Sequence, residues 1–362
     1  GLIRVDAAES GRQGAPVAVR DVALLPRGGS VLVDVLGNDT DPTGGVLVVQ
    51  SVNAGASSPL DVEVLDHNIL QIHDVRGLQQ QGAIRYTVSN GTASASGEVS
   101  VLPVEPPETL LPPSASADTA TVRVGDVVDI AVLDNDSSPT GDELTLNPVL
   151  AQGIDPLDGQ LFVSENTLRF VAGDTAKTVY AIYEVQDSTG QSDSAQVRIN
   201  IRPRDDEKNT PPVPRNLEGR AIAGSTVRIP VPLDGLDADG DSVFLGGISG
   251  APRLGAAVPG PNYIDYTASA TGAGTDSFTY EVRDRLGLVN TGTVRVGIAP
   301  VAEANQKPVA VNDAVTVRPG REVAVPVLQN DSDPDGDPIS LDPDGVSSQE
   351  SGTEARAEDN RG

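Results

Sequence analysis

The sequence predicts an all-β protein made of tandem β-sandwiches arranged in an extended rod, and three observations lead to this prediction. Similar segments recur at a nearly fixed period along the chain. Each segment contains several short runs in which apolar and polar residues alternate, and proline-rich or polar stretches separate the segments. A fixed period indicates an array of similar modules, and many short alternating runs without a helical period indicate sandwiches.

Each repeat opens with a proline that is followed five residues later by Asp or Asn. These pairs are Pro16/Asp21, Pro113/Asp118, Pro211/Asn216 and Pro308/Asp313, and the prolines lie 97 or 98 residues apart. The next element is a short strand whose apolar residues alternate, which is the pattern of a strand with one buried face. Its alternating residues are Val31/Val33/Val35, Val128/Ile130/Val132, Val227/Ile229/Val231 and Val323/Val325/Val327.

An acidic turn follows this strand in each repeat, at residues 37–42, 134–139, 234–241 and 330–337. Later in the first three repeats a strand carries Tyr86, Tyr183 and Tyr280, each followed four residues on by Asn or Asp. We expect these tyrosines in the cores, with their hydroxyls bonded to nearby backbone, as in the tyrosine corner of sandwich proteins. A final strand closes each of these repeats.

The predicted organisation is four repeats, the last of them partial. Residues 1–15 are expected to be the end of a preceding repeat and its linker, so we expect the array to continue on both sides. The repeats span 16–104, 113–202, 211–299 and 308–362, with linkers around 103–113, 202–214 and 300–308. Because proline stiffens and extends a linker, successive modules are expected to lie end to end.

Three motifs resemble tandem bacterial immunoglobulin-like and cadherin-like surface domains. They are the Pro-Val-Ala-Val-Asn-Asp opening at 308–313, the acidic Val-Leu-Gln-Asn-Asp-Ser-Asp-Pro-Asp-Gly-Asp run at 327–337, and Tyr-Glu-Val-Arg-Asp at 280–284. The resemblance implies immunoglobulin-like sandwiches, an extracellular or cell-surface location and a role in adhesion. Repeats 1 and 2 depart from the acidic pattern, with Thr-Gly-Gly at 43–45 and Ser-Ser at 137–138.

Composition narrows the possible partners and chemistry. The 52 acidic residues outnumber the 25 Lys and Arg, for a net charge of −27, which disfavours nucleic acid and anionic lipid. The chain has no Cys, so thiolate catalysis and zinc–thiolate sites are excluded. No apolar run is long enough to span a membrane.

The acidic turns are the candidate metal sites, because alternating carboxylates on a tight turn supply the hard oxygen ligands that calcium prefers. The topology places each turn at the end of the sandwich that faces the previous repeat, together with the turn after the Tyr strand. Calcium there would stiffen the joint. The stronger candidates are Asp237, Asp239, Asp241, Asp284, Asp313, Asp331, Asp333, Asp335 and Asp337. The less complete sets in repeats 1 and 2 are Asp39, Asp41, Asp118, Asp136 and Asp187.

No residue pattern predicts catalysis, so we do not expect an enzyme. His67 and His73 both lie in repeat 1 without counterparts elsewhere, and the carboxylates recur with the repeat instead of forming one unique pair. The favoured function is a stalk or adhesin shaft of a secreted or cell-surface protein, with neighbouring repeats, the cell wall or another cell surface as partners. One alternative is a spacer array of a large secreted hydrolase. Another is a lectin-like module, but the small number of aromatic residues disfavours the lectin.

Overall fold

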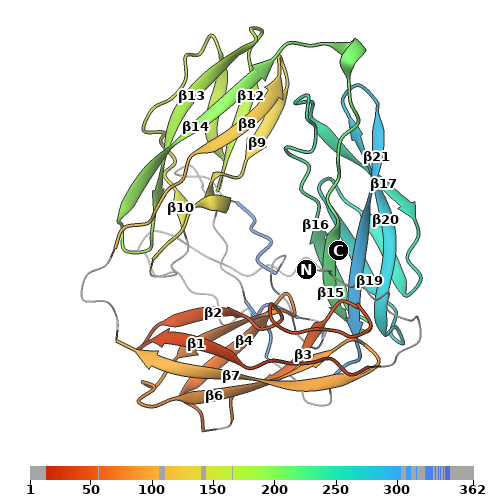
Figure 1. The fold of residues 1–362 in the computed structure, drawn as a ribbon. Coiled ribbons are helices and arrows are strands. Elements are labelled where there is room, and N and C mark those ends of the chain that lie inside the picture. Colours follow the sequence, from red (N-terminus) through yellow and green to blue (C-terminus); the bar gives the residue numbers. More distant parts are fainter. Residues whose placement is uncertain are drawn as a thin grey trace, which may run out of the picture.

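The computed structural model describes residues 14–105 except 56, residues 111–302 except 140–143 and 165, and separate positions between 307 and 342. It confirms the predicted fold class, since three β-sandwiches account for repeats 1 to 3 (Figure 1). The only helical segments among the described residues are two short 3₁₀ turns, Val132–Asn135 and Asp206–Lys208. No described helix is long and apolar enough to cross a membrane.

Each sandwich packs a four-stranded sheet against a three-stranded sheet. In repeat 1 the sheets have the orders β1-β7-β6-β3 and β2-β5-β4. The first strand pairs in parallel with the last, while all other named pairs are antiparallel. The strands are β1 (Asp21–Pro26), β2 (Ser30–Asp34), β3 (Val48–Asn53), β4 (Leu60–Leu65), β5 (Ile69–Asp74), β6 (Gly82–Ser89) and β7 (Ser94–Val104).

Repeats 2 and 3 have the same plan, with sheets β10-β13-β14-β8 and β11-β12-β9 in repeat 2, and β15-β21-β20-β17 and β16-β19-β18 in repeat 3. Repeat 2 consists of β8 (Asp118–Arg123), β9 (Val127–Ile130), β10 (Thr145–Leu146), β11 (Gly159–Ser164), β12 (Thr167–Ala172), β13 (Lys177–Gln186) and β14 (Ser192–Arg202). Repeat 3 consists of β15 (Leu217–Ile222), β16 (Thr226–Pro230), β17 (Val243–Gly250), β18 (Gly255–Pro259), β19 (Tyr263–Ala268), β20 (Gly274–Asp284) and β21 (Val289–Ala299).

Every sandwich has its own apolar core, and the recurrent tyrosine lies in it. Tyr86, Tyr183 and Tyr280 are at most 1% exposed. Each hydroxyl lies within hydrogen-bond distance of a backbone carbonyl, Val35 O at 3.2 Å, Ser116 O at 2.8 Å and Arg215 O at 2.6 Å. The predicted role of these tyrosines is therefore confirmed, because burying a phenol requires a partner for its hydroxyl.

The arrangement of the sandwiches differs from the extended rod that the linkers suggested. Repeat 3 contacts repeat 1 as well as repeat 2, so the three modules close on one another (Figure 1). Val48 of repeat 1 is fully buried with Ile222 and Ala299 of repeat 3, and Arg220 Nε donates to Leu47 O at 2.9 Å. Proline stiffens each linker but leaves the angle at its ends free, and the apolar end of repeat 3 supplies a surface for repeat 1 to cover.

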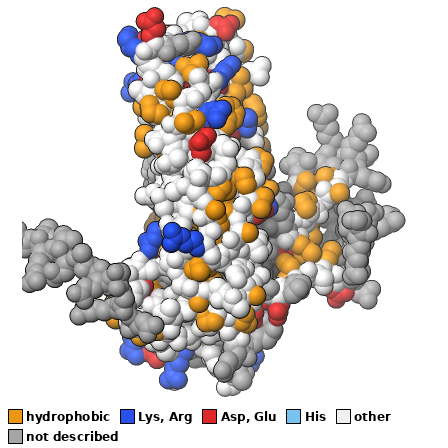
Figure 2. Space-filling view, turned by 90° about the vertical axis from the view of Figure 1, so that its right-hand side faces the viewer, with side chains coloured by type: hydrophobic (Ala, Val, Ile, Leu, Met, Phe, Trp, Pro, Cys, Tyr) orange, Lys and Arg blue, Asp and Glu red, His pale blue; other side chains and the backbone are white. Residues whose placement is uncertain are grey.

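The outer face of the assembly has a mixed composition. In the view of Figure 2, hydrophobic side chains are scattered along the face and are interspersed with Lys, Arg and a few acidic groups. Scattered exposed apolar residues are normal on a protein surface. This face therefore shows no single charged or apolar area that dominates it.

Candidate metal centre at the joint between repeats 2 and 3

The acidic loop of repeat 3 is folded around one carboxylate. Asp237 lies in the connection from β16 to β17, and its Oδ1 accepts the N–H groups of Asp239 at 2.8 Å, Gly240 at 3.1 Å and Asp241 at 3.4 Å. Gly240 has φ of +87°, a conformation that glycine adopts without strain. The Asp-x-Asp-Gly-Asp sequence therefore forms a tight turn with the first carboxylate at its centre.

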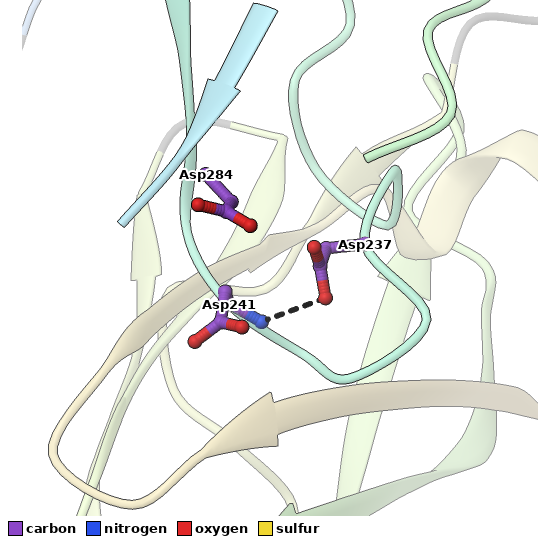
Figure 3. A group of neighbouring side chains, drawn as sticks. All are labelled: Asp237, Asp241 and Asp284. Atoms are coloured by element: carbon purple, nitrogen blue, oxygen red, sulfur yellow. Dashed lines mark hydrogen bonds between the residues drawn. The ribbon is translucent and has the colours of Figure 1, made fainter. Parts of the chain in front are cut away.

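Three carboxylates meet at this loop. Asp237 and Asp241 come from the loop and Asp284 from the end of β20, and one oxygen of each lies within 4.8 Å of the others (Figure 3). The three residues are 5%, 8% and 2% exposed. Among the described residues, Asp237 Oδ2 is buried and accepts no hydrogen bond, whereas the buried Asp241 Oδ2 has only an ion-pair contact with Arg123. Buried anionic oxygens without donors are costly unless a cation compensates them.

The pKa values of two of these carboxylates are raised. Burial raises the pKa of Asp241 to about 6, with further increases from Asp237 and Asp284, although Arg123 acts in the opposite direction. Burial also raises the pKa of Asp237, despite the backbone N–H groups that it accepts. A bound cation would favour the ionised form of both side chains.

The nearest positive group belongs to repeat 2. Arg123 is the last residue of β8, and its Nε lies 3.0 Å from Asp241 Oδ2. Its other nitrogens approach the linker, where NH2 donates to Asn209 Oδ1 at 3.0 Å. Asn209 Nδ2 in turn donates to Asp284 Oδ2 at 2.6 Å. The cluster therefore lies at a joint, with its three carboxylates from repeat 3 and its nearest cation from repeat 2.

A small hollow, partly open to solvent, adjoins the cluster. Its lining includes Thr121, Val127, Leu233, Asp234, Asp237 and Asp241. The donor set here consists of carboxylate oxygens, with no sulfur or imidazole ligand. Such a set fits a hard divalent cation, and calcium, which takes six to eight oxygens, would need water or backbone oxygens to complete its shell.

The other candidates of repeats 3 and 4 are placed differently. Asp239 turns toward Thr210, whose N and Oγ1 donate to Asp239 Oδ2 at 2.8 and 2.6 Å. In repeat 4, Asp333 Oδ1 accepts the N–H groups of Asp335 at 2.9 Å and Asp337 at 3.4 Å, as Asp237 Oδ1 accepts those of Asp239 and Asp241. The prediction for Asp331 stays a prediction, and Asp313 lies outside the described residues.

Repeat 1 has an Asp–Asn pair where repeat 3 has two carboxylates. The backbone bonds Val17 N to Thr40 O and Val213 N to Leu236 O correspond, which aligns Asp41 with Asp237. Asn90 then occupies the position of Asp284, and its Nδ2 donates to Asp41 Oδ1 at 3.0 Å. An amide hydrogen thus lies where a metal would have to bind, so the weaker prediction for repeat 1 has a physical reason.

The remaining carboxylates of repeats 1 and 2 surround the buried tyrosines. Tyr86 OH lies 3.0 Å from Asp21 Oδ2 and 3.1 Å from Asp39 Oδ2. Asp136 takes the place of Asp39 in repeat 2, with both oxygens 3.2 Å from the hydroxyl of its tyrosine. Burial raises the pKa of Asp118, whose Oδ1 accepts from Asn135 Nδ2 at 3.1 Å. These residues are thus brought together around a phenol and do not join the metal cluster.

Asp187 forms a local turn instead of a ligand group. Its Oδ1 accepts the N–H groups of Thr189 and Gln191, both at 2.9 Å. Among the described residues, only Asp237, Asp241 and Asp284 group as three metal-binding side chains. His67 and His73 lie elsewhere, in repeat 1, and neither lines the hollow at the joint.

Two features of the metal cluster and of the carboxylates around the tyrosines could not be predicted from the sequence of the acidic turns alone. One is Arg123, whose sequence position carries no sign of a contact with another repeat. The other is the tyrosine–carboxylate group, which the equal spacing of Asp21 and Asp39 before Tyr86, and of Asp118 and Asp136 before Tyr183, could have revealed.

Comparison with solved structures yields distant similarities. An endo-fucoidan hydrolase from glycoside hydrolase family 107 matches over 80% of this chain at 16% identity and a TM-score of 0.25, and this chain covers 45% of it, less than half its length. The four N-terminal Ig domains of Dscam1 isoform 1.9 match over 79% of this chain and 72% of their own at 11% identity and a TM-score of 0.25. Human desmocollin-1 ectodomain matches over 85% and 65% at 14% identity and a TM-score of 0.20. No function is inferred from similarities at these scores.

The family assignment rests on a sequence model. No curated protein matches this chain. The model of the bacterial Ig domain matches it four times, over residues 13–102, 111–200, 209–297 and 305–360. These matches cover most of the chain with the period that the sequence shows, so the protein belongs to the bacterial Ig domain family as a tandem array.

Proposed function

We propose that this chain is a non-catalytic structural segment, a stalk or adhesin shaft, of a secreted or cell-surface bacterial protein, with calcium bound at the joint between repeats 2 and 3. Domains of this family are typically non-catalytic and are usually found on extracellular proteins, which supports the non-catalytic role and the secreted or cell-surface location. Repeats 1 to 3 each have a core of their own. An array of such modules provides length and spacing.

The observation that carries the calcium proposal is the buried cluster of Asp237, Asp241 and Asp284. Its position between two repeats would let one ion link the loop of repeat 3 to the linker region through Asn209, which bonds to Asp284. Extracellular calcium is millimolar, and weak extracellular sites bind it with dissociation constants of about 10⁻⁴–10⁻³ M. At tenfold excess over the dissociation constant, binding stabilises the native state by about 1.4 kcal/mol.

The test is calorimetric calcium titration and thermal melting of the full 362-residue chain, with chelator and magnesium as separate arms. We expect calcium to bind and to raise the midpoint of the repeat 3 transition, and the variant Asp237→Asn/Asp284→Asn to lose this response. The control is Asp66→Asn, which removes an exposed carboxylate of repeat 1. An equal response to magnesium, or an undiminished response in the double variant, would refute calcium binding at this cluster.

A further inference from the structure

Arg123 is a buried cation, and among the three sandwiches that the structure describes only repeat 2 has a cation at this position. It is 4% exposed. In the parallel pairing of first and last strands it stands opposite Arg202, and the equivalent positions are Pro26 in repeat 1 and Ile222 in repeat 3. A buried guanidinium requires compensating acceptors, and those acceptors lie across the joint in repeat 3.

The guanidinium is directed at the metal cluster by several contacts. Its Nε lies 3.0 Å from Asp241 Oδ2, and its NH2 lies 3.6 Å from Asp239 Oδ2. Through Asn209 it is connected to Asp284. The backbone holds it in place as well, because Arg123 N donates to Gly240 O at 2.8 Å.

One guanidinium cannot neutralise the cluster. Asp237, Asp241 and Asp284 carry three formal negative charges when ionised, and Asp237 Oδ2 has no hydrogen-bond donor although Arg123 is present. A divalent cation bound to the three carboxylates would have to use Asp241, whose Oδ2 faces Arg123. Two cations that share one carboxylate at this distance repel each other strongly in a buried site.

We propose that Arg123 is the built-in counter-ion of the repeat 3 cluster, and that a divalent cation exchanges with it at Asp241. This inference rests on the proposed calcium site. The joint has a second set of contacts that exchange leaves in place, since Ser242 N donates to Asp126 Oδ2 at 3.0 Å and Arg285 NH1 lies 3.3 Å from Asp126 Oδ1. Exchange therefore releases one connection between the repeats and retains another.

The matched pair of variants is Arg123→Gln and Arg285→Gln in the full chain. Both remove an arginine from the same joint, but Arg285 contacts Asp126 and Gly125 instead of the cluster. If calcium must displace Arg123, its removal should lower the calcium dissociation constant at least about fivefold, the lower end of typical coupling between sites. Arg285→Gln should leave the constant within about twofold of that of the unaltered chain.

Hydrogen exchange provides the second measurement. With chelator, Arg123→Gln should accelerate exchange in β17 and β20, because the carboxylates lose their counter-ion, and saturating calcium should abolish the difference. If Arg123→Gln binds calcium equally well or more weakly than the unaltered chain, the proposed displacement of Arg123 by calcium is refuted, but the calcium site itself is not. If neither the unaltered chain nor Arg123→Gln binds calcium, both the proposed calcium site and the displacement of Arg123 are refuted.

Discussion

Replacement of Tyr86 by Phe tests the tyrosine–carboxylate group of repeat 1. The hydroxyl lies within 3.1 Å of carboxylate oxygens of Asp21 and Asp39, whereas the hydroxyl of Tyr280 in repeat 3 donates to the Arg215 carbonyl at 2.6 Å. A hydrogen bond to a charged group contributes about 1.5–3 kcal/mol and a neutral one about 0.5–1.5 kcal/mol. We therefore expect Tyr86→Phe to cost about 2 kcal/mol and Tyr280→Phe about 1 kcal/mol at pH 7.

The cost for Tyr86 is limited because each carboxylate keeps another donor. Asn38 Nδ2 donates to Asp21 at 2.9 Å, and Val19 N donates to Asp39 at 2.7 Å. The cost should also fall in acid, since a proton taken up by one carboxyl can replace the lost hydroxyl hydrogen between the two. Tyr280→Phe has no such carboxylate pair, so its cost should not change with pH.

Hydrogen exchange resolved by peptide is the suitable assay, because unfolding of a multidomain chain is not described by one two-state transition. A loss of about 2 kcal/mol corresponds to roughly 30-fold faster exchange in β6, and about 1 kcal/mol to roughly fivefold in β20. Equal acceleration of the two strands at pH 7, or a cost for Tyr86→Phe that does not decrease at pH 4.5, would refute the role assigned to the carboxylates.

Other substitutions test the pH response, the core and the arrangement of repeats. Burial raises the pKa of Asp39 and of its neighbour Asp21. Their contribution to stability is therefore greatest below the ordinary pKa of 3.8 and is lost as pH rises through the raised values. Asp39→Asn should stabilise repeat 1 at pH 7 and lose this advantage near pH 4, as measured by hydrogen exchange in β6. The pKa of Asp276 is shifted in the opposite direction, because hydrogen bonds from Arg253, Leu254 and Tyr266 outweigh burial and lower it. Asp276→Asn should cost about 1–3 kcal/mol at pH 7 and progressively less as pH falls through the lowered value. A cost that does not change with pH would contradict this. Gly97→Val should destabilise repeat 1 by about 1–3 kcal/mol, since even a Cβ there would lie 2.1 Å from Tyr86 Cζ, and unchanged exchange in β7 would contradict it. Val48→Asp should open the contact between repeats 1 and 3 and raise the radius of gyration, measured by small-angle scattering, from about 21 Å for a compact chain toward about 35 Å for three modules in line. The control is Val22→Asp, at a position that is 60% exposed. Equal scattering curves for the two variants would contradict the contact.

The fold was predictable because its signals are local and repeated. Alternation at Val31, Val33 and Val35 defines a strand within five residues. The recurrence of Tyr86, Tyr183 and Tyr280 at 97-residue intervals aligns the modules without knowledge of the three-dimensional structure. The grouping of Asp237, Asp241 and Asp284 could also be predicted, since strand topology alone places the two turns at one end of the sandwich.

The contacts between repeats were not predictable in the same way. Whether Arg123 reaches Asp241 depends on the angle between repeats 2 and 3, which no local pattern encodes. The contact of Val48 with Ile222 likewise depends on how the chain turns through two linkers. The direction of Asp239 is decided by Thr210, a linker residue, so alternation along the acidic loop did not determine which carboxylates meet.

The contact between repeats 1 and 3 has a mechanical consequence. In both inter-repeat contacts the acidic-loop end of one sandwich meets the opposite end of another: the segment 237–242 of repeat 3 on repeat 2, and the segment 44–48 of repeat 1 on repeat 3. Such heterologous contacts close into a ring or continue as an open filament, depending on their rotation. A pull on the two ends of the three-repeat segment loads the contact between repeats 1 and 3 directly, because those repeats are not consecutive in the chain. That contact would part first and release length while every sandwich stays folded, which makes the segment a reserve of extension.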